Sequence, residues 1–251
     1  MESSPAVLTP FQITVATLFF SLPESDGFLL AGGAALAAQH LTTRPTHDLD
    51  LFTRTGQNSV AAARDALENA AAERGWSIQR IRDSATFCRL MVTGDDNLLV
   101  DLALDSPPNL PPAASLAGPT FGLEELAGRK LLALFDRAEA RDFADVFMLA
   151  KRYPVDRILE AAAQVDSGFD RTTLATMLGS LSRFNDSDIP VASDVVAELR
   201  QFFHDWQEKL LAESAGENRT RGRAPLRHPT VVTGLERRVS PVAHQCVEAA
   251  G

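Results

Sequence analysis

Apolar residues follow two different patterns along the chain, and the change of pattern divides it into two parts. Up to residue 105, short apolar runs bounded by Gly, Pro, Asn or Asp alternate with helical stretches, which is typical of a sheet with helices on it. From Leu123 to the early 210s, apolar residues recur at helical spacing instead. The predicted fold class is therefore α/β (α+β): a core with a mixed sheet, followed by a C-terminal helical domain.

The first part is predicted to contain three helices and five strands. Thr9-Pro10 is a helix-start signal, and Pro23 ends the helix that it opens. The turn Gly94-Asp95-Asp96-Asn97 suits an antiparallel hairpin. The predicted helices are 8–22, 34–40 and one between Phe52 and Trp76; the predicted strands are 28–30, the run that carries Asp48 and Asp50, 77–82, 86–93 and 98–104.

Residues 106–122 contain five prolines and two glycines, which excludes regular structure and predicts a linker. The hydrophobic pattern fails after Ala212, where the chain becomes polar and rich in Arg, Gly and Pro. We therefore expect four segments: a core at 1–105, the linker at 106–122, the helical domain at 123–213 and a largely disordered tail at 214–251.

A single long helix is predicted from Glu124 to Arg152, and it carries a carboxylate among apolar residues. Asp142 falls in the middle of the apolar stripe of that helix, where an unpaired charge would cost several kcal/mol. Asp142 therefore needs a cation, a hydrogen-bonding partner or access to a polar cleft. Lys130, Arg137 and Arg141 lie on an adjacent face of the predicted helix.

Composition excludes several classes of protein. With 45% apolar residues, 251 residues can bury a substantial core, yet no apolar run approaches the ~20 residues needed to cross a bilayer. No basic region precedes the apolar stretch at 13–22, so we expect no secretory signal and a cytoplasmic location. The two cysteines, Cys88 and Cys246, lack metal-type spacing, which makes a disulfide framework or a zinc site improbable.

The net charge of -9 argues against extensive contact with nucleic acid, but the charge is uneven. After Glu213, six arginines stand against three glutamates, so this tail carries +3 and the rest of the chain -12. An acidic body still allows RNA as a substrate, bound weakly and through a local patch. The tail is a candidate contact for RNA phosphates or for a protein partner.

The stretch from Phe28 to Phe52 carries the clearest candidate chemistry. Gly32-Gly33 follows the first apolar run, and glycines let backbone N–H groups approach an anion at the start of the following helix. On the next strand, Asp48 and Asp50 point the same way because side chains alternate faces. When two carboxylates lie so close together, the pKa of one of them rises unless a hard cation such as Mg²⁺ lies between them.

The string from AGGAALA through Arg44 and Thr46 to DLDLF resembles the AbiEii/AbiGii-type toxins, within the polymerase beta-like nucleotidyltransferase superfamily. The resemblance implies a nucleotidyltransferase core with Asp48, Asp50 and Asp101 as ligands of Mg²⁺. Asp101 would also act as local base, since the superfamily's third acidic residue lies on a later strand. The alternatives are a solvated carboxylate on an outer strand, or Asp105 in that role.

A second match lies in the predicted long helix, where Lys130 is followed by Arg141-Asp142 and Asp145. The family carries a lysine and an aspartate required for activity there, which implies catalytic roles for Lys130 and Asp142. The alternative is an ion-pair network within the helix that links Arg141 or Arg137 to Glu139 and Asp145. The implied nucleotide-binding set is Gly32, Gly33, Arg44, Thr46, Lys130, Arg141 and Asp145.

The resemblance implies transfer of a nucleoside monophosphate from an NTP to an acceptor hydroxyl, with the 3′ end of tRNA as acceptor and translation as the process stopped. It also implies a cognate antitoxin as partner. Three alternatives stay open: the same chemistry on a protein hydroxyl, which the acidic body favours; a small-molecule nucleotidyltransferase of the antibiotic-modifying kind; and a binding-only protein that retains the fold.

Overall fold

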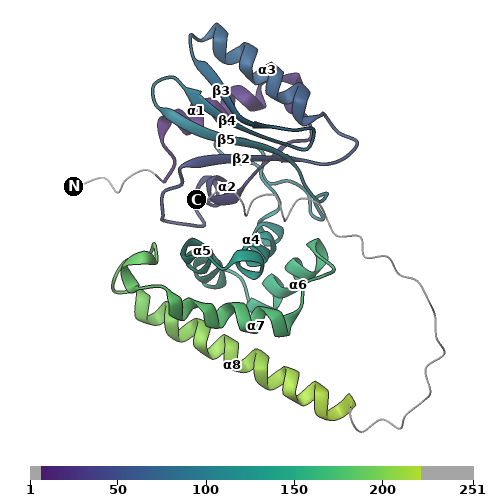
Figure 1. Ribbon diagram of the computed structural model, residues 1–251, viewed down its shortest axis with the longest axis vertical. Helices are drawn as coiled ribbons and strands as arrows, with labels where there is room; N and C mark the ends of the chain where they lie inside the picture. Colours follow the sequence, from purple (N-terminus) through teal and green to yellow (C-terminus); the bar gives the residue numbers. More distant parts are fainter. Residues whose placement is uncertain (1–6, 222–251) are drawn as a thin grey trace, which may run out of the picture.

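The computed structural model of the protein describes residues 7–221, and its helices and strands form two layers (Figure 1). In the first part, the elements are α1 (Pro10–Phe20), η1 (Pro23–Ser25), β1 (Leu29–Ala31), α2 (Gly32–Ala38), β2 (Asp48–Thr53), α3 (Val60–Glu73), β3 (Ser77–Asp83), β4 (Phe87–Thr93) and β5 (Asn97–Leu104). They are followed by α4 (Leu123–Arg137), α5 (Ala140–Ala150), α6 (Val155–Val165), α7 (Arg171–Gly179), η2 (Ser180–Arg183), η3 (Asp186–Asp188) and α8 (Val196–Arg221).

The five strands form one mixed sheet in the order β1-β2-β5-β4-β3, which confirms the predicted fold class. β2 and β5 run parallel, and the other neighbouring strands pair antiparallel. The parallel register sets Asp50 of β2 directly beside Asp101 of β5. Burial alternates along β2, with Leu49 and Leu51 in the core.

Local signals explain where several elements begin. The Thr9 side chain accepts a hydrogen bond from the backbone N–H of Gln12, and the Gln12 side chain accepts one from the N–H of Thr9, so α1 starts with a capping box before Pro10. Ser59 caps α3 in the same way by accepting from the N–H of Ala62.

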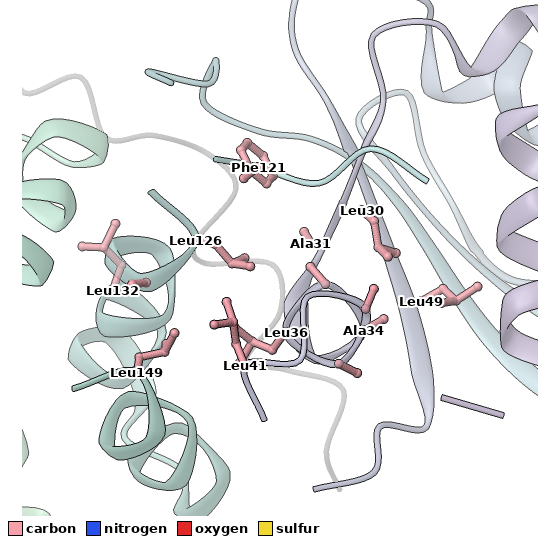
Figure 2. Close-up of a cluster of buried hydrophobic side chains, with 14 of the residues drawn as sticks. Leu30, Ala31, Ala34, Leu36, Leu41, Leu49, Phe121, Leu126, Leu132 and Leu149 are labelled. Atoms are coloured by element: carbon pink, nitrogen blue, oxygen red, sulfur yellow. The ribbon is translucent and has the colours of Figure 1, made fainter. Parts of the chain in front are cut away.

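α1 and α3 cover one face of the sheet, and α2 lies on the side that faces α4 and α5 (Figure 1). One continuous hydrophobic core joins the two layers. Figure 2 shows Leu36 and Leu41 facing the helical layer, where Leu126 of α4 and Leu149 of α5 lie. This shared core holds the helical layer against α2, which packs on β2, the strand that carries Asp48 and Asp50.

The predicted continuous helix from Glu124 to Arg152 is wrong, because the structure breaks it between Arg137 and Ala140. Ala138 adopts a left-handed conformation with φ of 47°, which ends α4. Glu139 and Asp142 then form the capping box that starts α5. The break carries no Gly or Pro, so local sequence signals could not reveal it.

The disordered tail was predicted to begin at residue 214, which is too early because α8 continues to Arg221. Residues 222–251, which include most of the arginine-rich segment, lie outside the described residues. The proline-rich segment 106–122 contains no helix or strand, as predicted, although Thr120 forms isolated bridges to Leu30 and Ala113.

Within residues 7–221, no helix has the length and apolar character needed to span a membrane.

Candidate active site

The diglycine turn between β1 and α2 lies directly against the Asp-x-Asp strand. Gly32 has φ of +62°, and a Cβ at this position would sit 1.7 Å from Oδ2 of Asp50. A Cβ on Gly33 would meet Oγ1 of Thr46 at 2.7 Å and Nη2 of Arg44 at 3.3 Å. Only glycine fits at Gly32, since both the backbone conformation and the lack of space exclude a side chain. The structure therefore brings the predicted residues of the two motifs together.

Asp50 is the one carboxylate of the predicted site for which residues 7–221 provide neither a hydrogen bond nor an ion pair. Asp48, two residues earlier, accepts a hydrogen bond of 2.9 Å from Oγ1 of Thr46. Burial, followed by the charges of Asp48 and Asp101, raises the pKa of Asp50 to about 7. The contribution of Asp48 is the like-charge effect expected from the Asp-x-Asp spacing, although burial is the larger cause.

Asp101 lies beside Asp50, but its two oxygens are occupied. Arg89 of β4 donates to them from Nε at 2.8 Å and from Nη2 at 2.7 Å. Asp101 is buried on a central strand, so the alternative of a solvated carboxylate on an outer strand is wrong. Among the described residues, no group of three His, Cys, Asp or Glu side chains is arranged as a ready-made metal site.

Asp145 joins the helical layer to the sheet by binding two cations. It accepts hydrogen bonds from Nε and Nη2 of Arg44, each 2.6 Å long, and its Oδ2 lies 3.0 Å from Nζ of Lys130. Burial would raise the pKa of Asp145, but Lys130 and Arg44 outweigh it and hold that pKa below its usual range. The predicted intrahelical network is thus wrong for Asp145, whose partners come from α4 and from the loop before β2.

Asp142 is fully buried, as its place in the apolar stripe predicted, and its partner is Arg137. Nε and Nη2 of Arg137 donate to the two oxygens of Asp142 at 2.9 Å each, and the backbone N–H of Glu139 donates at 3.1 Å. These hydrogen bonds raise the pKa of Arg137 above its usual range. Of the three cations that the sequence placed near it, Asp142 therefore pairs with Arg137 and not with Lys130 or Arg141.

Arg141 is the predicted residue that the structure leaves outside this cluster. Its side chain is 47% exposed and pairs with Glu139 at 2.8 Å. The residue that the sequence-based site set missed is Arg137, which acts electrostatically on Asp50 together with Lys130. The available signal was the spacing of seven residues between Lys130 and Arg137, which puts both cations on one face of a helix.

The raised pKa of Asp50 predicts that the metal-free protein loses stability as the pH rises from about 4 to 7. The folded state keeps the proton of Asp50 in that window while the unfolded state releases it, so the stabilising contribution is full below pH 4 and gone above pH 7. About three pKa units correspond to on the order of 2–4 kcal/mol after allowance for partial exposure.

Chemical denaturation of wild type and Asp50→Asn in EDTA, from pH 4.5 to pH 8, measures this effect. We expect wild type to lose stability relative to the variant across the range. Parallel curves for the two proteins would show that Asp50 titrates normally.

Solved structures of known proteins show which class of protein has this fold. Helicobacter pylori JHP933 has a TM-score of 0.51 and 20% identity over 85% of this chain and 99% of its own. The Mycobacterium tuberculosis nucleotidyltransferase toxin MenT4 has a TM-score of 0.50 and 15% identity over 79% of this chain and 92% of its own. The fold that this chain shares with them is a nucleotidyltransferase fold.

The family within this class follows from the sequence profile described as "Nucleotidyl transferase AbiEii toxin, Type IV TA system", which matches residues 17–212. The chain therefore belongs to the AbiEii nucleotidyltransferase toxin family of type IV toxin–antitoxin systems. No curated protein sequence matches it significantly.

Proposed function

We propose that the protein transfers a nucleoside monophosphate from an NTP to an acceptor hydroxyl. The observation that carries this proposal is the cluster at the ends of β1 and β2, where a diglycine turn, the unpaired carboxylate of Asp50 and the cations Lys130 and Arg44 lie together. Membership in the AbiEii family supports the same chemistry.

The glycines and the two cations are assigned to the triphosphate. Backbone N–H groups at Gly32 and Gly33 can approach phosphate oxygens because no side chain shields them. α2 has only seven residues, so these direct contacts matter more than its dipole. Lys130 and Arg44 share a single carboxylate, Asp145, which leaves one positive charge in excess for the phosphates.

The donors present fit Mg²⁺. Within residues 7–221 Asp50 has no ion pair, burial and its acidic neighbours raise its pKa to about 7, and Asp48 is two residues away on the same face of β2. Mg²⁺ in nucleotide sites is commonly held by one or two carboxylates together with substrate phosphates, so a third protein ligand is not required. When bound, the ion would shield the negative charge of the phosphates, which otherwise repels the attacking hydroxyl oxygen.

Asp101 is the proposed acceptor of the proton from the attacking hydroxyl. The hydroxyl oxygen forms a bond to the α-phosphorus, the bond to the β-phosphate oxygen breaks, and pyrophosphate leaves. This role requires Arg89 to release one of the two oxygens that it now holds. Lys130 and Arg44 stabilise the charge that builds up on the phosphates.

For the acceptor we propose the 3′ end of tRNA, with a cognate antitoxin as the partner that restrains the activity. The toxin–antitoxin family supports the antitoxin as partner, whereas the tRNA acceptor rests on the resemblance of the two motifs. The net charge of -9 favours a protein hydroxyl as the second candidate, since an acidic surface repels RNA phosphates.

Incubation with each labelled NTP in turn, together with Mg²⁺, total tRNA and cell protein, tests the proposal. We expect label in the tRNA fraction for one NTP or a few, and none in EDTA. Label in protein would support the second candidate, and label in small molecules would indicate an antibiotic-modifying type of enzyme. If no fraction is labelled, a binding-only role replaces transfer.

A further inference from the structure

The guanidinium of Arg137 lies in the candidate active site, yet the roles assigned above do not use it. Arg137 is the last residue of α4 and stands seven residues after Lys130, about two helical turns along the same face. Their carboxylate partners, Asp145 for Lys130 and Asp142 for Arg137, stand about one turn apart on α5. The guanidinium of Arg137 therefore lies next to the cluster in which Asp145 holds Lys130 and Arg44.

Contacts from three directions fix the position of Arg137. The left-handed Ala138 ends α4 directly after it. The fully buried Asp142 accepts hydrogen bonds from its Nε and Nη2, and Nη2 of Arg183 donates to the carbonyl oxygens of Arg137 at 3.2 Å and Ala138 at 2.6 Å. Both the backbone and the side chain of Arg137 are thus held before any substrate binds.

The contact with Asp142 uses only one edge of the guanidinium. Nη1 donates no hydrogen bond to any residue in the range 7–221, and the Arg137 side chain is 34% exposed. The other nearby carboxylate, Glu139, lies 3.8 Å from Nε. A guanidinium held along one edge by a carboxylate can bind a second anion along the other edge, which an ammonium group cannot do in the same fixed geometry.

We propose that Arg137 binds the triphosphate of the NTP and that Asp142 is a positioning residue that acts through Arg137. This inference rests on the proposed function. It assigns Arg137 to the triphosphate because Arg137 lies beside the pair of cations, Lys130 and Arg44, that Asp145 holds, and Arg44 borders the diglycine turn. Asp142 itself does not touch the substrate.

Calorimetric titration with inorganic tripolyphosphate and Mg²⁺ tests the inference without a choice of base. We expect Arg137→Gln to weaken binding about tenfold or more, the scale of a lost charge-assisted contact. Asp142→Asn should weaken it by a similar factor, although its side-chain oxygen can still accept the N–H of Glu139. The matched control is Arg157→Gln, since Arg157 is 57% exposed on α6 and pairs with Glu124 and Glu160.

Arg137→Lys keeps a positive charge beside Asp142, so it shows whether weaker binding arises without unfolding of the protein. We expect it to melt close to wild type and still bind tripolyphosphate more weakly, because an ammonium group cannot serve both anions. If wild type binds and Arg137→Gln binds as tightly as Arg157→Gln, the role of Arg137 is overturned while the proposed function stands. If wild type itself does not bind magnesium tripolyphosphate, the proposed function fails and this inference fails with it.

Discussion

Replacing Asp48 by Ala or Asp50 by Asn should abolish nucleotide transfer, with a loss of ~1000-fold or more, while the protein stays folded. A loss of that size corresponds to about 4 kcal/mol of transition-state stabilisation, within the several kcal/mol that a bound metal ion supplies. Folding should not suffer, because Asp50 repels Asp48 and Asp101 in the metal-free protein. At pH 8, Asp50→Asn should even be more stable than wild type.

Initial transfer rates and thermal melting on the same preparations measure both effects. The control is Asp95→Asn, which alters an exposed carboxylate in the turn between β4 and β5. In cells, wild type should slow growth and Asp48→Ala should lift the effect. A folded Asp48→Ala or Asp50→Asn protein with full activity would falsify the metal assignment, and equal growth inhibition by wild type and Asp48→Ala would exclude toxicity through catalysis.

Replacing Asp145 by Asn should lower both stability and activity. Asp145 is the carboxylate between Arg44 and Lys130, and its neutral replacement leaves two largely buried cations facing each other. Breaking a buried ion pair from one side costs roughly 3–5 kcal/mol. Transfer should also fall ~100-fold, the scale of one lost preorganised contact, because Lys130 and Arg44 are no longer held at the phosphates.

Lys130→Met separates the two effects of Asp145. This variant removes one cation but keeps the pair of hydrogen bonds between Arg44 and Asp145, so most of the stability should remain while transfer still falls. Glu160→Gln, at an exposed ion pair on α6, should change neither quantity. Denaturant titration and initial rates decide the matter. An Asp145→Asn protein that is unstable but transfers at the wild-type rate when folded would reduce Asp145 to a structural role.

Much of the sheet and part of the site could be predicted because their signals are local. The alternation of side chains along a strand puts Asp48 and Asp50 on one face whatever the rest of the chain does. Gly32-Gly33 was recognisable because a diglycine between an apolar run and a helix lets backbone N–H groups approach an anion, and the structure adds the positive φ and the nearby carboxylate at Gly32. Thr9 and Pro10 marked the start of α1 by chemistry confined to one helical turn.

The pairing of charges could not be predicted, because it joins residues that are distant in sequence. Arg44 and Asp145 are 101 positions apart, and Arg89 reaches Asp101 only because β4 and β5 pair in one particular register. The break at Ala138 is similar, since Arg183, some 45 positions later, donates to the carbonyl oxygens at the end of α4. Helical periodicity reports which face a residue occupies, not which partner packs against it.

The sequence by itself determined the mixed α/β class, the diglycine and Asp-x-Asp motifs, and the burial of Asp142, since each depends on residues within one or two turns or strands. The tertiary structure decided which cation each carboxylate binds. It placed Lys130 with Asp145, Arg137 with Asp142 and Arg89 with Asp101, and among residues 7–221 it gave Asp50 no ion pair. The physical reason is that a buried charge takes whichever partner the packing of sheet and helices brings within hydrogen-bonding distance.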